Sequence, residues 1–424
     1  MRLPWNRQNN LTDPPLERSG MITPEQARDL ILAHVRALPA IMQPATEALA
    51  FHLAEPILAD RDVPPADRSA MDGYAVRAGD VAKTPVVLPV GAEVAAGSPC
   101  GNPVPSGACV RIFTGGNIPA GADAVVIQEN TEPEGEKAVR ILKPVAVGEN
   151  VFKQGENAKH GETLLERGVR LDASALALCA AVGRASLRVH RRPVAGVLAT
   201  GSELMDAGEV VLTHQIRDSN SPFLRAALAE HHVTVLRCER ATDHADRIVA
   251  SLCAMARQTD VVILTGGVSV GRYDFTAEAV KSAGGVILFH GVAIKPGKPL
   301  LFAVTPEGRL IFGLPGNPLS AMVGFHEFVL PALRLLSGCP QGRCWPCLTV
   351  RVGKDITLKG ERQTYLPARL NWTPTGPEAV EVYVKGSSDL VAGAKAEGTL
   401  VVPANVKHLA AGSFLSFRPW RGLA

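Results

Sequence analysis

Three glycine-rich turns between residues 200 and 318 carry residue types that bind anions. Their glycines let backbone N–H groups approach a ligand, their hydroxyl groups add donors, and a predicted helix begins after each turn. The residues expected to contact the ligand are Thr200, Gly201, Ser202, Gly266, Gly267, Ser269, Gly271, Pro315, Gly316, Asn317 and Pro318. The turns match neither a Walker loop nor a Rossmann fingerprint, so they predict another kind of anion site. The alternative is that the glycines serve only tight packing.

Three carboxylates, Glu203, Asp243 and Asp274, each follow a predicted strand in the same region. Hard oxygen ligands beside phosphate oxygens suit Mg²⁺, which often keeps several of its waters. We expect catalytic roles for all three, and we expect Glu203 and Asp274 to bind the Mg²⁺. Asp243 has an alternative role as a helix cap, and Asp274 could cap a helix that contains Thr276.

Two lysines, Lys295 and Lys298, lie in a short segment with a glycine and two prolines, and the prolines restrict the backbone. The sequence Lys-Pro-Gly-Lys-Pro lies between two predicted strands, and its prolines limit the backbone conformations of the segment. Lysines held in this way favour a phosphate or another oxyanion as partner, and we expect catalytic roles for both.

The elements that must position these residues alternate between strand and helix from residue 193 to residue 338. Apolar runs of four to eight residues predict strands at 194–199, 233–238, 260–264, 286–289, 300–304 and 310–312. Helical patterns lie at 221–230, 243–255 and 276–283, and a long helix begins at Pro318. This alternation predicts an α/β domain with three layers around a mostly parallel sheet. In such sheets, ligands bind beyond the carboxyl ends of the strands, where the turns and carboxylates lie.

The rest of the chain predicts further domains. Residues 1–20 are expected to form a flexible tail, and residues 21–192 to form helical segments with an inserted β-rich domain at about 50–160. The first helix is predicted to start at Thr23, because Pro24 suits the first helical position and Gln26 completes a capping box with Thr23. It is expected to bury Ile31, Val35 and Leu38 on one face. A second helix is predicted over 172–182. Residues 339–424 are expected to form a small C-terminal β domain with strands near 348–352, 363–366, 379–384 and 414–417.

Composition narrows the class of protein. The net charge of +3, from 44 basic and 41 acidic side chains, is too small and too dispersed for a typical nucleic-acid binder. We expect no membrane span, because the apolar stretch at 310–336 is interrupted by prolines, a histidine and a glutamate and belongs in a globular core. The first 20 residues lack the apolar region of a signal peptide. The irregularly spaced cysteines, 8 in all, indicate reduced thiols and a cytoplasmic location. The close cluster Cys339, Cys344 and Cys347 could be a metal or disulfide site, but a linker without function is the preferred interpretation.

A second polar surface is predicted in the β-rich domain. Asp72 lies within the run from Asp67 to Ala75, and Thr114 lies within the run from Arg111 to Gly116. Polar residues among glycines indicate ligand contact, but composition alone does not identify the ligand.

Six motifs identify a resemblance to a known family. The motifs are SAMDGYAVR, RIFTGGNIPAGADAVV, TGSEL, TGGVSVGRYD, IKPGKP and GLPGNPLSA, in this order along the chain. Together they resemble the molybdopterin molybdenumtransferases of the MoeA–gephyrin family. The similarity runs from about residue 23 to the C-terminus and weakens after residue 340.

The resemblance implies a multidomain homodimer whose active site is shared between the α/β domain of one subunit and the SAMDGYA domain of the other. The implied reaction cleaves adenylylated molybdopterin with Mg²⁺ and with molybdate as substrate, and it releases molybdenum cofactor and AMP. An upstream adenylyltransferase and a downstream molybdoenzyme are implied as partners. By position, Glu203, Asp243 and Asp274 match acidic active-site residues of the family, and Lys295 and Lys298 match the lysines of its PGK motif. Asp72 and Thr114 match residues that the partner subunit contributes to the active site. Pro315 and Pro318 match the GLPGNP turn.

Three positions depart from the family pattern. Phe152 stands where an arginine is common, Asn157 where an aspartate is common, and Gly291 where a lysine is common. A paralogue specialised for one molybdoenzyme, or weakened activity, would explain the lost charges. Three other functions therefore stay open beside the transferase: a non-catalytic cofactor carrier or scaffold, a pterin adenylyltransferase, and a general nucleotide-binding module.

Overall fold

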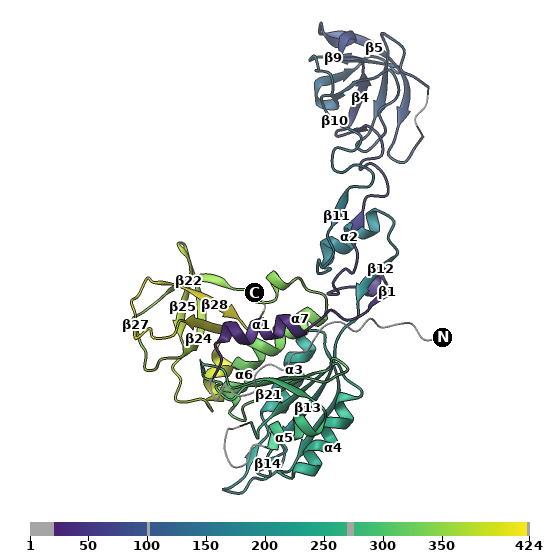
Figure 1. Cartoon of the computed structure of the whole chain (residues 1–424). Coiled ribbons are helices and arrows are strands. Elements are labelled where there is room, and N and C mark those ends of the chain that lie inside the picture. The colour runs from purple at the N-terminus through teal and green to yellow at the C-terminus, as the bar shows by residue number, and fades with distance from the viewer. Residues whose placement is uncertain (1–20, 100–101, 269–274, 422–424) are drawn as a thin grey trace, which may run out of the picture. The chain divides into compact units, whose positions relative to one another are not determined.

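The computed structural model describes residues 21–99, 102–268 and 275–421, which form two compact units. One unit holds residues 21–41, 50–54 and 188–421, and the other holds residues 42–49 and 55–187. The predicted flexible tail, residues 1–20, lies outside the described residues. Figure 1 shows the helices and strands of each unit.

A six-stranded sheet is the centre of the first unit. Its strands, in spatial order, are β16 (Thr234–Ala241), β13 (Val194–Thr200), β17 (Val261–Thr265), β21 (Leu310–Leu314), β20 (Leu301–Val304) and β18 (Val286–His290). The first four strands are parallel, while β20 is antiparallel to both of its neighbours. The predicted mostly parallel α/β sheet is therefore confirmed, and the carboxyl ends of four adjacent strands meet at one edge.

Helices cover both faces of this sheet and give it three layers. The helices are α3 (Asn220–Glu230), α4 (Ala245–Ala256), α5 (Phe275–Ser282), α6 (Pro318–Gly324) and α7 (Leu330–Leu336). Side chains alternate between the faces along each strand. On β17, Val261 and Ile263 pack in the cluster that contains α3, α6 and α7, whereas Val262 and Leu264 pack against α4 and α5.

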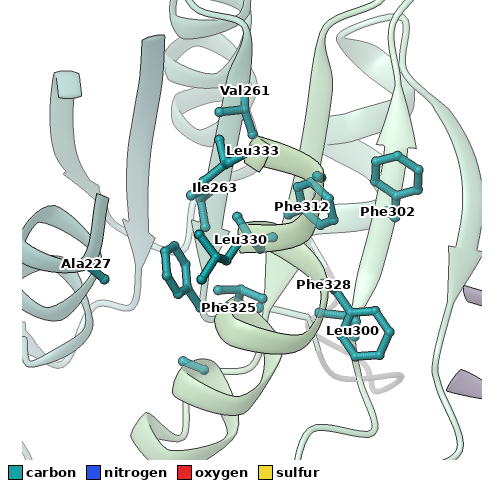
Figure 2. Packing of buried hydrophobic residues seen from close by; sticks show 14 of the residues in the cluster. Ala227, Val261, Ile263, Leu300, Phe302, Phe312, Phe325, Phe328, Leu330 and Leu333 are labelled. Atoms are coloured by element: carbon teal, nitrogen blue, oxygen red, sulfur yellow. The ribbon is translucent and has the colours of Figure 1, made fainter. Parts of the chain in front are cut away.

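The first of these clusters is the larger core. Figure 2 shows side chains of the long helix packed against the strands, among them Phe325, Phe328, Leu330, Leu333, Ile263, Phe302 and Phe312. The rings of Phe302 and Phe312 are stacked with centroids 4.7 Å apart. Because the cluster reaches the start of α6, it fixes the position of the turn that precedes this helix.

The long helix over Pro318–Leu336 is long and apolar enough to cross a membrane, but 89% of its most apolar window is buried. Its predicted place in the globular core is therefore confirmed. A π-helical turn, Phe325–Val329, separates α6 from α7. Pro331 has no N–H group, so the Glu327 carbonyl four residues earlier lacks its usual partner. Trp345 Nε1 donates to that carbonyl at 2.8 Å and satisfies it.

The first helix, α1 (Pro24–His34), begins as predicted but is shorter than its apolar pattern indicates. Thr23 and Gln26 form the predicted capping box. Val35 is already extended, with ψ of 132°, so the prediction that Leu38 continues the helix is wrong. Leu38 precedes Pro39, and a residue before proline disfavours helical backbone. Ile31 and Val35 are nevertheless buried in the main core.

The C-terminal strands of this unit close into a small barrel. In order they are β24 (Gln363–Thr373), β25 (Gly376–Glu381), β22 (Leu348–Val352), β28 (Phe414–Pro419) and β26 (Gly398–Val402), which pairs again with β24. Strand β19 (Ile294–Lys295) joins the edge of β24, and α8 (Leu390–Lys395) precedes β26. The small pairs β14 (Leu204–Met205) with β15 (Ile216–Arg217), and β23 (Ile356–Thr357) with β27 (His408–Leu409), complete this unit.

The second unit is rich in β-structure. Its main sheet contains β7 (Ala124–Ile127), β4 (Gly73–Val76), β6 (Cys109–Ile112), β5 (Val86–Val94), β9 (Ala138–Ile141) and β8 (Thr131–Pro133). Smaller pairs are β10 (Val151–Phe152) with β3 (Arg68–Ser69) and β11 (Thr163–Leu165) with β2 (Ile57–Leu58). Helix α2 (Ala173–Ala181) begins after Asp172, whose carboxylate accepts from the Ala175 N–H at 2.8 Å. Elsewhere, β1 (Ala40–Pro44) pairs with β12 (Ser186–His190).

Candidate functional site

A cleft of about 810 Å³ lies at the carboxyl edge of the central sheet in the first unit. It collects the turns that follow β13, β17 and β21, which are neighbours in the sheet. Among the predicted residues, the following line it: Thr200, Gly201, Glu203, Asp243, Gly266, Gly267, Pro315, Gly316, Asn317 and Pro318. Ser202 is not part of its lining, and Ser269, Gly271 and Asp274 lie outside the described residues. Parallel strand order thus brings together turns that are more than 100 residues apart in sequence.

Asn220, at the start of α3, links two of these turns. Its Nδ2 donates to Thr265 Oγ1 and to the Gly316 carbonyl, both at 2.8 Å. The side chain is only 8% exposed, so these two bonds replace lost hydration. Asn220 was not predicted from the sequence. The run from Asp218 to Asn220 before a helix was the available signal, because Asp218 accepts from the Ser221 N–H at 3.0 Å as a capping residue does.

Gly266 lies where the backbone turns after β17 and β13 approach each other most closely. Its φ is +91°, and a Cβ atom there would lie 2.2 Å from the Thr200 carbonyl oxygen. The Gly266 N–H donates to the Leu314 carbonyl at 3.2 Å, which ties this turn to β21 as well. Any other L-residue would strain the backbone and push the turns apart.

Replacing Gly266 with alanine should therefore disturb the cleft and the fold together. We expect the free energy of unfolding to fall by about 1–3 kcal/mol from backbone strain, with a further loss from the clash at Thr200. The affinity of the cleft for its ligand should fall at least about 10-fold, as measured by calorimetry. Gly308→Ala is the matched control, because Gly308 has φ of +79° but no atom within 4 Å of an added Cβ. Equal effects of the two variants would contradict the proposed role of the close approach.

The carboxylates of Glu203 and Asp243 both line the cleft. Asp243 does not cap α4: the cap position is His244, and no side chain caps this helix. Instead, Asp243 Oδ2 accepts from the Ser202 N–H at 3.1 Å, and Ser202 Oγ accepts from the Asp243 N–H at 3.2 Å. The alternative role for Asp243 as a helix cap is therefore wrong, because its carboxylate is used to join the turns after β13 and β16.

The donor set of the cleft fits Mg²⁺ in its chemistry. Mg²⁺ is commonly held by one or two carboxylates together with substrate phosphates and waters. Glu203 folds back over its own turn, since a Cβ on Gly201 would lie 2.8 Å from Glu203 Oε2. Within the described ranges, no three His, Cys, Asp or Glu side chains gather closely enough to hold a metal by themselves. The cleft therefore suits an ion that shares its ligands with a substrate.

The structure does not bring Lys295 and Lys298 into the lining of this cleft. The two residues are exposed, and Lys295 Nζ donates to the Lys359 carbonyl at 3.3 Å. The segment from Ile294 to Lys295 was expected to be a loop, but it pairs as β19 with β24 of the barrel. The catalytic roles of the two lysines stay predictions. Among the described residues of the lining, Arg217 is the only one that carries a positive charge.

The barrel domain also contributes to the cleft. Ser388 and Leu390, close to the start of α8, are part of its lining. Asn317 Nδ2 donates to Ser387 Oγ at 2.8 Å, which joins the turn before α6 to this segment. These residues were not predicted from the sequence, because neither α8 nor its contact with α6 has a signal in the local pattern. The described lining residues that were not predicted from the sequence are Leu204, Ile216, Arg217, Asp218, Ser219, Asn220, Thr265, Val268, Pro299, Ser388 and Leu390.

In the second unit, the predicted residues Asp72 and Thr114 bond to each other. Asp72 Oδ1 accepts from both the N–H and the hydroxyl group of Thr114, each at 2.7 Å. These two bonds, aided by the charge of Arg111, lower the pKa of the Asp72 carboxyl below its ordinary value of 3.8. Asp72 is thus ionised at neutral pH, and Thr114 is held in one orientation.

A second cavity, of about 720 Å³, lies within the same unit. Its lining includes Thr114, Phe152 and Asn157. Phe152 and Asn157, two of the three positions that depart from the family pattern, therefore face the same cavity as Thr114, which is a predicted substrate-binding residue. The side chain of Phe152 is 51% exposed. An arginine and an aspartate at these two positions would have made this cavity more strongly charged.

Comparison with known proteins covers nearly the whole chain. Three family models match in order: "MoeA N-terminal region (domain I and II)" over residues 22–183, "Probable molybdopterin binding domain" over 196–335, and "MoeA C-terminal region (domain IV)" over 349–420. A protein of Staphylococcus aureus named molybdopterin molybdenumtransferase is 32% identical over 405 residues, which are 94% of this chain and 95% of that protein. A Bacillus subtilis protein of the same name is 34% identical over 369 residues, 85% of each chain.

A solved structure agrees with these sequence relatives. The crystal structure of the molybdopterin biosynthesis MoeA protein of Pyrococcus horikosii superposes with a TM-score of 0.80 at 30% identity. It covers 95% of this chain and 100% of its own. The likeness therefore extends over all of the domains described above and is not limited to the α/β sheet.

Proposed function

Because this chain belongs to the MoeA family of molybdopterin molybdenumtransferases and so acts in molybdenum cofactor biosynthesis, we propose that its cleft binds adenylylated molybdopterin. In this proposal the enzyme inserts molybdate, its second substrate, into the pterin and releases AMP in a reaction that depends on Mg²⁺. The observation that carries the proposal is the meeting of three donor-rich turns and two carboxylates in one cleft of about 810 Å³. Such a cleft suits a ligand that carries both a pyrophosphate and an oxyanion.

The described residues divide the work within this cleft. Backbone N–H groups of Gly267 and Gly316, with the N-terminus of α3, would hold phosphate oxygens. Arg217 would add one positive charge at the same edge. Glu203 and Asp243 would hold Mg²⁺, which when bound supplies charge neutralisation on the phosphoanhydride oxygens. The hydrogen bonds of Asn220 and Ser202 keep these groups in place before the substrate arrives, so little reorganisation is needed.

We further propose the homodimer and the surroundings that family membership suggests. Asp72 and Thr114 of the partner subunit would complete the active site. An adenylyltransferase would supply the substrate, a molybdoenzyme would receive the product, and both steps would take place in the cytoplasm. Analytical ultracentrifugation of the full chain tests the dimer directly.

The decisive experiment measures AMP release from adenylylated molybdopterin, with Mg²⁺ present and with molybdate present or absent. We expect AMP to appear together with molybdenum cofactor, in a molybdate-dependent manner. Formation of adenylylated pterin and pyrophosphate from molybdopterin and ATP would instead identify an adenylyltransferase. Tight binding of finished cofactor without AMP release would identify a carrier or scaffold, and equal affinity for ATP and pterin ligands would identify a nucleotide-binding module.

A further inference from the structure

Two cysteines, Cys339 and Cys344, lie close together on the segment that joins α7 to the barrel. Cys339 Sγ lies 3.6 Å from the Pro340 carbonyl oxygen, and Cys344 Sγ lies 3.4 Å from the same oxygen. The two sulfurs are therefore no more than 7.0 Å apart, which is the sum of these distances. The short 3-10 helix Gln341–Arg343 turns the chain back between them.

The turn that presents the pair is held from both sides. The Cys344 N–H donates to the Gln341 carbonyl at 3.2 Å, which closes the turn. Arg334 Nη1, from α7, donates to the Cys344 carbonyl at 2.9 Å. The cysteine pair is thus presented by an ordered segment, with Cys344 buried and Cys339 partly accessible to solvent.

Cationic and donor groups surround the Cys339 sulfur. Hydrogen bonds from the Cys344 thiol and from His52, together with the charge of Arg334, outweigh burial and hold the pKa of the Cys339 thiol well below its ordinary value. The Cys344 thiol, which donates to Cys339 and is buried, has its pKa raised. His52 is only 8% exposed, and its Nδ1 has no hydrogen-bond partner. One sulfur is thereby prepared as a thiolate and the other as a thiol beside it.

The other described cysteines lack this environment. Burial raises the pKa of Cys109 to about 12, which leaves it unreactive. Cys347 is exposed, but it is not among the groups that shift the pKa of Cys339. A metal site does not explain the pair, since no three suitable ligands gather anywhere in the part of the chain that the structure describes.

We propose that Cys339 and Cys344 form a reactive thiol pair that reduces hydrogen peroxide and closes to a reversible disulfide. The Cys339 thiolate attacks one peroxide oxygen, so that an S–O bond forms, the O–O bond breaks and hydroxide leaves as water after taking a proton. Cys344 then loses its proton, and its sulfur attacks the sulfenic acid on Cys339. The S–S bond forms, the S–O bond breaks, and a second water leaves. The two thiols are oxidised by two electrons, and the peroxide is reduced.

Mass spectrometry of the full chain tests the proposal. The reduced protein is treated with hydrogen peroxide, blocked with N-ethylmaleimide and digested without reductant. We expect the loss of two of the 8 free thiols and a cross-linked peptide that joins Cys339 to Cys344. In Cys344→Ser, dimedone should label Cys339 instead, because the sulfenic acid has no partner. Cys347→Ser is the matched control, and it should form the cross-link as the natural protein does.

Alkylation kinetics provide a second measurement that does not depend on disulfide closure. At pH 6 an ordinary thiol is only about 0.3% thiolate, and a thiol whose pKa is lowered has a larger thiolate fraction. After allowance for the lower nucleophilicity of the more acidic thiol, Cys339 should react with iodoacetamide about 10-fold faster than N-acetylcysteine. Oxidation confined to Cys347, or the absence of both the cross-link and the dimedone adduct, would overturn the proposal.

Discussion

Asp243→Asn should lower the rate of AMP release by about 100- to 1,000-fold, the range typical for the loss of one well-placed electrostatic group in an active site. Asparagine retains a carbonyl oxygen that can accept from the Ser202 N–H, so the turns after β13 and β16 should keep their geometry. The negative charge is lost, however, and with it the ability to hold a divalent cation beside the substrate. We therefore expect the remaining activity to need a higher Mg²⁺ concentration. Steady-state rates over a series of Mg²⁺ concentrations measure both effects.

The matched control for this variant is Asp246→Asn. Asp246 is exposed in the first turn of α4, three residues further along, and is not part of the cleft lining. The same change of charge there should leave the Mg²⁺ dependence unaltered. Glu203→Gln should behave like Asp243→Asn, since both carboxylates line the cleft. Full activity in both cleft variants, with an unchanged Mg²⁺ requirement, would remove the two carboxylates from the proposed mechanism.

Asp260→Ala should lower the free energy of unfolding by about 3 kcal/mol, although the residue is remote from the cleft. The Asp260 side chain is 4% exposed and lies at the amino ends of β13 and β17. It accepts two bonds from Arg191 at 2.7 Å, one from Arg309 at 2.9 Å and one from the Val194 N–H at 2.9 Å. Its removal leaves two guanidinium groups without their shared partner. Both are about one-third exposed, which limits the loss. Denaturant titration measures the change.

This carboxylate should also contribute to acid sensitivity. Burial by itself would raise the pKa of Asp260, but the bonds from Arg191 and Val194 and the charge of Arg309 outweigh burial and hold it below 3.8. The stability that the ionised group provides is therefore present above about pH 4 and is lost as the pH falls through its lower folded value. Asp260→Asn should abolish this part of the acid dependence. Its AMP release at neutral pH and low temperature should remain near that of the natural protein, because the cleft lies at the opposite ends of the strands. A pH profile that is the same in both proteins would contradict the assignment.

Local sequence signals determined much of the secondary structure of this protein. The capping box at Thr23, the start of α2 after Asp172 and the alternation of strands and helices after residue 193 depend on neighbours within a few residues, so they are visible in the sequence. Strand order places the turns after β13, β17 and β21 at one edge. Once a parallel sheet is predicted, that common edge follows, because parallel strands end on the same side.

Only the tertiary structure decided which side chains reach the cleft. Asn220 connects Thr265 with Gly316 across 45 and 96 residues, and Asn317 bonds to Ser387 across 70. Strand β19 pairs with β24, which draws Lys295 to the barrel and not to the cleft lining. These contacts depend on hydrogen bonds and strand pairing between distant segments, whose partners no local periodicity specifies. The same is true of Cys339: its spacing from Cys344 is visible in the sequence, but the approach of His52 and Arg334, which lowers the pKa of this thiol, exists only in the folded chain.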